Sequence, residues 1–227
     1  MTRSTVVGFA FGVMASMIVV AAQTPNPGPN AARPDPNSVK MFGDRFKPLT
    51  YAEMTPPQKK MFENLISGER RGAGGPFNVL LRSPEMGDLA QQFGASMRYH
   101  SSIPAKLNEM AIIITARHWT SQYEWSAHRR AAQTAGLSQG IIDAIAAGKR
   151  PSSMAPEEEA VYDFVSELLT TKQVSDATFK AAKDTFGERG VVDLIGVSGY
   201  YQLVSMLLNV DRYPLAEGTT PELKPLR

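Results

Sequence analysis

The sequence predicts an all-α, single-domain protein, on two observations. First, residues that start helices (Ser, Thr or Pro) and residues that end them (Gly) recur in order from about residue 50 onward. Second, apolar residues between these signals recur every three or four positions, whereas Val/Ile/Thr runs with the alternation of β-strands are missing. With 227 residues, 43% of them hydrophobic, the chain is long enough for one domain with a sizeable core.

The first 22 residues have the pattern of a secretory signal peptide. Arg3 supplies a positive charge, residues 6–20 form an apolar stretch, and Val20-Ala21-Ala22 places small residues before Gln23. We therefore expect a protein that is exported to a bacterial periplasm or secreted, with no stable membrane insertion once this segment is cleaved. An uncleaved membrane anchor is the alternative, although the stretch is short for a bilayer span.

Residues 23–49 are expected to form a linker rich in Pro and Asn and an N-terminal extension. Five prolines stand among Asn, Gly and Ala between residues 23 and 37, a composition that favours an extended tether. The helical domain is then expected over residues 50–215, and residues 216–227 are expected to form a tail.

The first half of the domain contains three predicted helices. A capping box at Thr55 starts the first, and Ser83 precedes the second. The third runs from Pro104 to about Trp119 and is apolar nearly all round at its centre, which is typical of a buried helix. Residues 68–75 are rich in Gly and Arg but lack the Lys-Ser/Thr of a phosphate-binding loop, so we interpret them as a flexible connection.

The second half of the domain continues with shorter and longer helices. Caps and apolar spacing predict them over about residues 122–135, 138–148, 156 onward, 175–187 and 191–210. The segment after Pro156 opens with three glutamates, which complement the helix dipole. The last helix is again largely apolar, so we expect it to be central in the fold.

Composition excludes two classes of function. The formal net charge is +2 and basic residues are scattered among acidic ones, so no nucleic-acid-binding surface is expected. The chain has no cysteine, so it forms no disulfide and performs no thiol-based redox chemistry.

One face of the predicted 122–135 helix carries chemically useful side chains. Ser121, Glu124 and His128 are spaced i, i+3 and i+7, so they lie on the same side. Glu109 lies on the preceding buried helix, and antiparallel packing of the two helices would bring it near His128. A buried carboxylate is costly unless it is partnered, and a histidine–carboxylate pair can move a proton near neutral pH. Glu109, Glu124 and His128 are therefore the catalytic candidates.

The same spacing also fits a structural interpretation. Glu and His four residues apart are common as surface or capping pairs, and Tyr123 and Trp125 beside them suit core or interface packing as well as substrate contact. His100 and His118 are interpreted as structural.

The segment from Glu109 to His128, EMAIIITARHWTSQYEWSAH, resembles the core of the carboxymuconolactone decarboxylase family, which includes the alkylhydroperoxidase D proteins. The peroxidase branch has Glu, eleven residues, Cys, two residues, Cys, three residues and His. Here Ser121 and Glu124 stand at the two cysteine positions, so the chain is similar to a cysteine-less branch that cannot perform peroxidase chemistry. Further similarity lies in residues 75–86, 98–104 and 187–209.

The resemblance implies an alkylhydroperoxidase D-like helical bundle, a homo-oligomer of three or six subunits, and decarboxylation of a small lactone or carbonyl carboxylic acid without a metal or organic cofactor. An unsaturated carbonyl would accept the electrons left by CO₂, and the site would deliver a proton to the resulting dienolate. His128 is the expected proton donor, oriented by Glu109 and Glu124. The expected substrate-binding residues are Arg98 or Arg117 as a carboxylate clamp, Ser121, Tyr123 and Trp125.

Three alternatives remain at this point. Either arginine could equally be a surface or interface charge. The whole protein could be an exported binding or assembly protein that keeps the helical scaffold without catalysis. A metal site formed by His128, Glu124 and Glu109 is a weaker possibility, because this ligand set is thin. The namesake reaction belongs to a cytoplasmic pathway, so export favours a different small lactone or carbonyl acid as substrate.

Overall fold

The computed structural model describes residues 33–225, and in this part of the chain all regular structure is helical, as predicted. The predicted signal peptide, residues 1–22, and residues 23–32 of the linker lie outside the described residues. The α-helices are α1 (Pro56–Ser67), α2 (Phe77–Leu80), α3 (Pro84–Tyr99), α4 (Ala105–His118), α5 (Gln122–Thr134), α6 (Gln139–Ala146), α7 (Pro156–Thr171) and α8 (Asp176–Asp211). Two short 3₁₀-helices, η1 (Pro36–Ser38) and η2 (Tyr51–Glu53), precede them.

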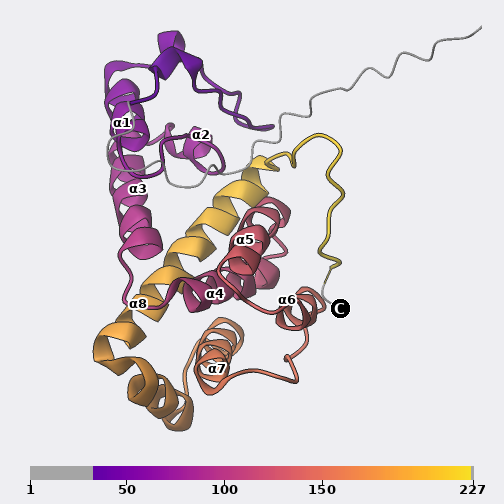
Figure 1. Ribbon diagram of the computed structural model, residues 1–227. Helices are drawn as coiled ribbons and strands as arrows, with labels where there is room; N and C mark the ends of the chain where they lie inside the picture. Colours follow the sequence, from indigo (N-terminus) through magenta and orange to yellow (C-terminus); the bar gives the residue numbers. More distant parts are fainter. Residues whose placement is uncertain (1–32, 226–227) are drawn as a thin grey trace, which may run out of the picture.

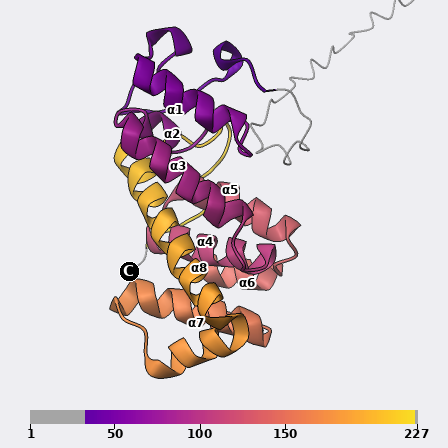
Figure 2. The same ribbon diagram turned by 90° about the vertical axis from the view of Figure 1, so that its left-hand side faces the viewer.

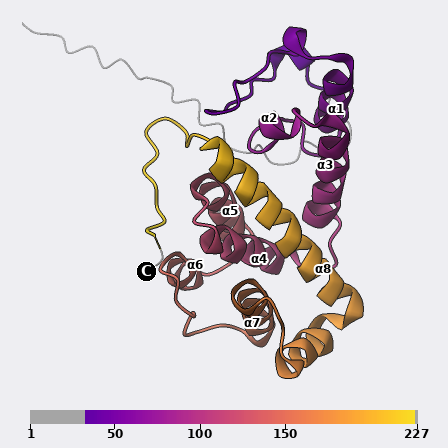
Figure 3. The ribbon, with the colours of Figure 1, turned by 180° about the vertical axis from the view of Figure 1, so that it is seen from behind.

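Helix α8 runs along the length of the molecule and connects its two halves (Figures 1 and 2). Helices α2 and α3 contact α8 directly and α1 packs on α3, whereas α4, α5 and α7 contact α8 directly and α6 packs on α4. The view from behind shows the same order, with the C-terminal segment returning beside α5 toward α6 (Figure 3).

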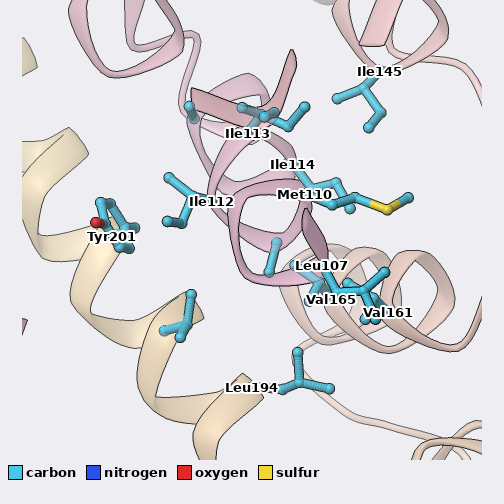
Figure 4. Packing of buried hydrophobic residues seen from close by; sticks show 14 of the residues in the cluster. Leu107, Met110, Ile112, Ile113, Ile114, Ile145, Val161, Val165, Leu194 and Tyr201 are labelled. Carbon is cyan, nitrogen blue, oxygen red and sulfur yellow. The ribbon is translucent and has the colours of Figure 1, made fainter. Parts of the chain in front are cut away.

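The two halves have separate hydrophobic cores. The larger core surrounds α4, whose residues 110–114 are all buried, which confirms the prediction of a buried helix. Figure 4 shows α4 side chains between residues of α6, α7 and α8, among them Ile145, Val161 and Leu194. The smaller core lies among α1, α2 and α3, and Leu203 and Leu207 of α8 pack against it. The two cores meet along α8, and this junction is where the candidate site lies.

Helix starts follow the predicted caps. The backbone N–H of Thr55 donates to Oε1 of Gln58 at 2.9 Å, as a capping box requires. The side chain of Ser138 accepts from the backbone N–H of Ile141 at 3.3 Å at the start of α6, and Ser175 caps α8 in the same way.

Gly187 interrupts α8 with a sharp bend. Its φ of 69° and ψ of 178° are not helical, so α8 consists of two helices joined at this residue. This confirms the predicted end of one helix at Gly187 and the start of another shortly after it. Residues with a side chain rarely adopt this backbone conformation, whereas glycine adopts it at little cost in free energy.

Within residues 33–225, α8 has the length and composition of a membrane-spanning helix. Half of its most apolar stretch is buried inside the molecule, and its buried residues form the two cores described above.

The segments before residue 50 and after residue 215 both pack against the predicted helical domain. A carboxylate oxygen of Asp211, at the end of α8, accepts hydrogen bonds from the backbone N–H groups of Asp44 (3.2 Å) and Phe46 (2.8 Å). Near the other end of the chain, Leu223 is buried in the larger core.

Replacing Gly187 with alanine should lower the free energy of unfolding by about 1–3 kcal/mol, because alanine would be strained at this φ and ψ. Gly199→Ala is the matched control. Gly199 lies in the helical part of α8 with no atom within 4 Å of an added Cβ, so alanine there should be neutral or stabilising by up to about 1 kcal/mol. Urea unfolding measures the free energy of unfolding of both variants. An equal change in the two would contradict the conclusion that the backbone conformation at position 187 requires glycine.

Candidate functional site

The turn between α4 and α5 brings the predicted catalytic residues together. Thr120 adopts a left-handed conformation with φ of 48°, and the backbone N–H of Ser121 donates to the carbonyl of Ala116 at 2.9 Å. The chain therefore reverses over three residues and α5 packs back against α4. This pairing brings Glu109 of α4 beside His128 of α5.

His128 lies between two carboxylates. Its Nδ1 is 2.6 Å from Oε2 of Glu109, a hydrogen bond in which the imidazole N–H donates to the carboxylate. Its Nε2 is 3.3 Å from Oε1 of Glu124, an ion-pair contact. The side chains of His128, Glu109 and Glu124 are 5%, 12% and 3% exposed, so the whole cluster is buried. Glu109 thus orients the ring, and Nε2 is directed toward Glu124.

Burial raises the pKa of Glu124 to about 7. His128, Arg98 and Arg70 lower it, and Glu109 raises it further, but the loss of hydration has the largest effect. Near neutral pH, Glu124 is therefore close to half protonated. Its carboxyl lies 3.3 Å from Nε2 of His128, so the two groups are close enough to share a proton.

A small cavity opens beside Glu124 and His128. Its volume is about 40 Å³, enough for roughly two or three water molecules. The cavity is lined by Arg70, Gly74, Gly75, Pro76, Phe77, Arg98, Tyr123, Glu124, Ala127, His128, Tyr200, Tyr201 and Val204. These residues come from α2, α3, α5, α8 and the segment before α2, so both halves of the molecule contribute.

Two arginines, Arg98 and Arg70, line this cavity together with Glu124 and His128. Arg98, at the end of α3, is 5.4 Å from the ring of Tyr99. Burial lowers the pKa of Arg98, but Tyr201, Tyr99, Glu109 and Glu124 together outweigh burial, so the net pKa is raised and the guanidinium stays charged. Arg70 lies 5.2 Å from the ring of Phe77. Cations held against aromatic rings in this way are well placed to meet an anionic ligand.

Sequence reasoning missed Arg70, because residues 68–75 were interpreted as a flexible connection. In the structure, Arg70 also lies 5.9 Å from the rings of both Tyr99 and Tyr200, and its Nη2 donates to the hydroxyl of Tyr200 at 3.4 Å. These partners are distant in sequence, so no local spacing indicates them.

Tyr201 was also missed as a site residue. Its ring packs edge-on against that of His128 with centroids 4.9 Å apart, and its buried hydroxyl has no hydrogen-bond partner among the described residues. Burial raises the pKa of Tyr201 well above its ordinary value, so the hydroxyl remains a proton-bearing donor. The sequence showed only an apolar helix here, in which an aromatic residue is expected for packing alone.

The remaining predicted substrate-binding residues are not all in this cavity. Tyr123 lines it, whereas Ser121 lines a second, separate cavity. Trp125 is a core residue whose indole N–H donates to Glu222 at 3.0 Å. Arg117 donates from Nη2 to the carbonyl of Lys224 at 2.7 Å, so it holds the C-terminal segment.

Among the described residues, no cluster of three or more His, Cys, Asp or Glu has the arrangement of a metal site. The positions of Glu109, Glu124 and His128 give the reason. Glu109 approaches Nδ1 of His128 and Glu124 approaches Nε2, so the two carboxylates are at opposite edges of one ring. A single ion cannot bind a ring nitrogen and both carboxylates in this arrangement.

Comparisons with known proteins do not identify the family. No protein-family model matches the chain, and no curated protein matches it.

The raised pKa of Glu124 should make stability depend on pH. The folded state keeps this proton up to a pKa of about 7, above the ordinary value of 4.5 in the unfolded chain. The resulting stabilisation is fully present below pH 4.5 and is lost as the pH rises through 7. A shift of this size corresponds to about 3 kcal/mol.

As the pH rises from 4.5 through 7, the free energy of unfolding of the wild type should therefore fall by up to about 3 kcal/mol because of Glu124. Glu124→Gln has no such proton to lose, so its free energy of unfolding should not show this part of the fall. Urea unfolding at a series of pH values between these limits measures the effect. Parallel stability profiles for the two proteins would show that Glu124 titrates normally.

Proposed function

We propose that this protein is a cofactor-free carboxy-lyase, or an enzyme of closely similar proton-transfer chemistry, on an alkylhydroperoxidase D-like helical bundle. Its substrate would be a small lactone or carbonyl carboxylic acid. The observation that carries this proposal is that Glu124 and His128, which contact each other, line one cavity together with Arg70 and Arg98. The resemblance of the segment Glu109–His128 to the carboxymuconolactone decarboxylases also supports it.

In such a reaction, the C–C bond to a carboxylate breaks and its electron pair passes into the conjugated carbonyl, forming a dienolate and CO₂. Arg70 and Arg98 would neutralise the negative charge of the substrate and of the dienolate oxygen. The hydroxyl of Tyr201 would donate a hydrogen bond to that oxygen. The aromatic walls would leave the departing carboxylate poorly solvated, which favours loss of its charge as CO₂.

Glu124 and His128 would then deliver a proton to the dienolate carbon. Both line the cavity, and the pKa of about 7 for Glu124 suits a group that must give and regain a proton near neutral pH. Glu109 does not line the cavity. Its hydrogen bond to Nδ1 of His128 makes it a positioning residue, which fixes the tautomer that presents Nε2 to Glu124.

Substrate binding requires a wall of the cavity to move. A volume of about 40 Å³ is far below that of usual ligand pockets, which are about 300–1,000 Å³. The wall formed by Arg70 and residues 74–76 belongs to no helix, and the N–H of Gly75 donates to the hydroxyl of Tyr213 at 3.0 Å. Release of this contact would let the wall open.

A second candidate function, an exported binding or assembly protein, is favoured by an exposed apolar face. On α8, Val192, Ile195, Met206 and Val210 are exposed at helical spacing, and the neighbouring α3 exposes Met86, Leu89 and Phe93. Leu89 is 71% exposed. We call these seven residues the α3–α8 face. Exposed apolar side chains on two neighbouring helices favour association, and we propose that they mediate a homo-oligomer.

Glu124→Gln and His128→Ala should each lower the rate of decarboxylation by about 100-fold or more, and the double variant should lose little more, because the two residues act as one unit. Release of CO₂ from a panel of small unsaturated-lactone carboxylates and 3-oxo acids measures this. Glu109→Gln should lower kcat strongly while KM changes little and should shift the pH profile.

The matched control is Glu158→Gln. Glu158 is another buried glutamate, but its partner is Lys106 (2.8 Å) and it lies outside the cavity. This variant should lose stability and keep its turnover. Full activity in His128→Ala would end the catalytic proposal, and absence of activity on every substrate in the wild type would favour the binding protein.

Light scattering at micromolar concentration should give the mass of an oligomer, with a trimer or hexamer as the expected size. Ile195→Glu, on the α3–α8 face, should reduce that mass to the monomer because it places a charge in an apolar contact. Phe179→Glu is the control, since Phe179 is similarly exposed but lies before the bend at Gly187. A monomeric wild type would overturn this expectation.

A further inference from the structure

The two arginines that line the cavity beside His128 are supported by the backbone in different ways. Arg98 lies on α3, whereas Arg70 lies in the segment between α1 and α2, which belongs to no helix and contains four glycines. An arginine side chain loses much conformational entropy when it is held in one orientation. The position of the Arg70 guanidinium therefore depends on contacts with other parts of the chain.

Three aromatic rings surround this guanidinium. Its Cζ lies 5.2 Å from the ring of Phe77, at the start of α2, and 5.9 Å from the ring of Tyr99, at the end of α3. The third ring is that of Tyr200 on α8, also at 5.9 Å. We call these three residues the aromatic cage. Tyr200 makes a second contact as well, because its hydroxyl accepts a hydrogen bond from Nη2 of Arg70 at 3.4 Å.

Tyr200 itself is held firmly between α3 and α8. It is only 2% exposed, and its ring packs edge-on against those of Phe93 at 5.9 Å and Tyr201 at 5.2 Å. Gly94 of α3 lies directly against the end of the phenol. A Cβ added to Gly94 would overlap Cζ and the hydroxyl oxygen of Tyr200. The absence of a side chain at position 94 thus gives the phenol its place beside Arg70.

Arg70 acts electrostatically on Glu124 from this position. Burial raises the pKa of Glu124 to about 7, and Arg70 is, with His128 and Arg98, one of the charged groups that lower it. Loss of the positive charge of Arg70 would therefore raise the pKa of Glu124 further. The other ionisable groups that interact with this carboxyl are Glu109 of α4, Tyr123 of α5, and Tyr200 and Tyr201 of α8.

We propose that Tyr200 is a positioning residue, which holds Arg70 at the cavity as the partner of a substrate carboxylate, and that Gly94 is required for this. Aromatic rings attract a cation without neutralising it, so the charge of Arg70 stays available to a ligand. A guanidinium in a fixed orientation can donate two parallel hydrogen bonds to a carboxylate. The substrate carboxylate rests on the proposed function, whereas the position of Arg70 does not.

Infrared titration of the full chain tests the position of Arg70 without a substrate. The carbonyl band of protonated Glu124, identified by its loss in Glu124→Gln, should titrate at about pH 7 in the wild type. Arg70→Gln should move this titration to higher pH by about 0.5 unit or more, because it removes a positive charge near the carboxyl. Tyr200→Phe, which removes only the hydroxyl, should shift it in the same direction. The double variant should shift it no further than Arg70→Gln alone.

Gly94→Ala should act as Tyr200→Phe does, because the added methyl group displaces the phenol. Gly199→Ala is its control, since no atom lies within 4 Å of a Cβ added there. Tyr162→Phe is the control for the tyrosine. Arg150 lies 5.4 Å from the ring of Tyr162, but this pair is outside the cavity. Both controls should leave the titration unchanged, and a substitution that only destabilises the fold would not move it.

Kinetics test the role of Arg70 toward the substrate. Tyr200→Phe should raise KM for a carboxylate substrate about fivefold and change kcat at its optimum pH by less than about twofold, because it weakens binding by Arg70. Inhibition by 4-oxopentanoate should weaken by the same factor. Inhibition by the methyl ester of this acid, which has no charge, should be unchanged.

The proposal is wrong if Arg70→Gln shifts the titration of Glu124 and Tyr200→Phe leaves it at the wild-type pH, since the hydroxyl then does not position Arg70. An unchanged titration in Arg70→Gln would also overturn it, because Arg70 would then not be held beside Glu124. The expected shifts in a protein without lyase activity would uphold this positioning and overturn the proposed function, so the two fail separately.

Discussion

The burial of three ionisable side chains at one point between α4 and α5 is the constraint on which the rest of the site depends. Glu109, His128 and Glu124 are almost completely buried, and an unpartnered charge there would cost several kcal/mol. Each imidazole nitrogen therefore faces a carboxylate, and two arginines line the cavity beside the cluster. The same burial raises the pKa of Glu124 to about 7. The pH dependence of stability and the proposed proton transfer thus have one physical origin.

The cavity exists because two hydrophobic cores meet along α8 without merging. Residues of α4 and α5 belong to the larger core, and Phe77 belongs to the smaller one. Polar groups at their junction are shielded from bulk water but remain beside a small space. Helix α8 supplies Tyr200 and Tyr201 at this junction, and its exposed side supplies the apolar α3–α8 face. One helix therefore connects the core, the site and the surface on which we propose association.

The segments before α1 and after α8 pack against the helices but contribute no residue to the cluster of Glu109, Glu124 and His128. Asp211 binds backbone N–H groups of the N-terminal segment, and Gln122 holds Leu223 of the C-terminal segment. Leu223 and Glu222 of the C-terminal segment contact Gln122, Trp125 and Arg129 of α5, the helix that also bears Glu124 and His128. Tyr123 lines both the cavity beside His128 and the open space under the C-terminal segment.

The sequence by itself determined the helices other than the short α2, the caps at Thr55, Ser138 and Ser175, the break at Gly187 and the cluster of Glu124, His128 and Glu109. These features depend on local spacing, or on a short turn that constrains two neighbouring helices. Only the tertiary structure decided that Arg70 and Tyr201 reach the same cavity, that Arg117 and Trp125 contact the C-terminal segment, and that Ser121 belongs to a different cavity. Those positions depend on contacts between residues more than 70 apart in the chain, such as Arg70 with Tyr200 and Arg117 with Lys224. No periodicity in a sequence encodes which distant helix will meet a given side chain, because that is decided by the packing of whole helices.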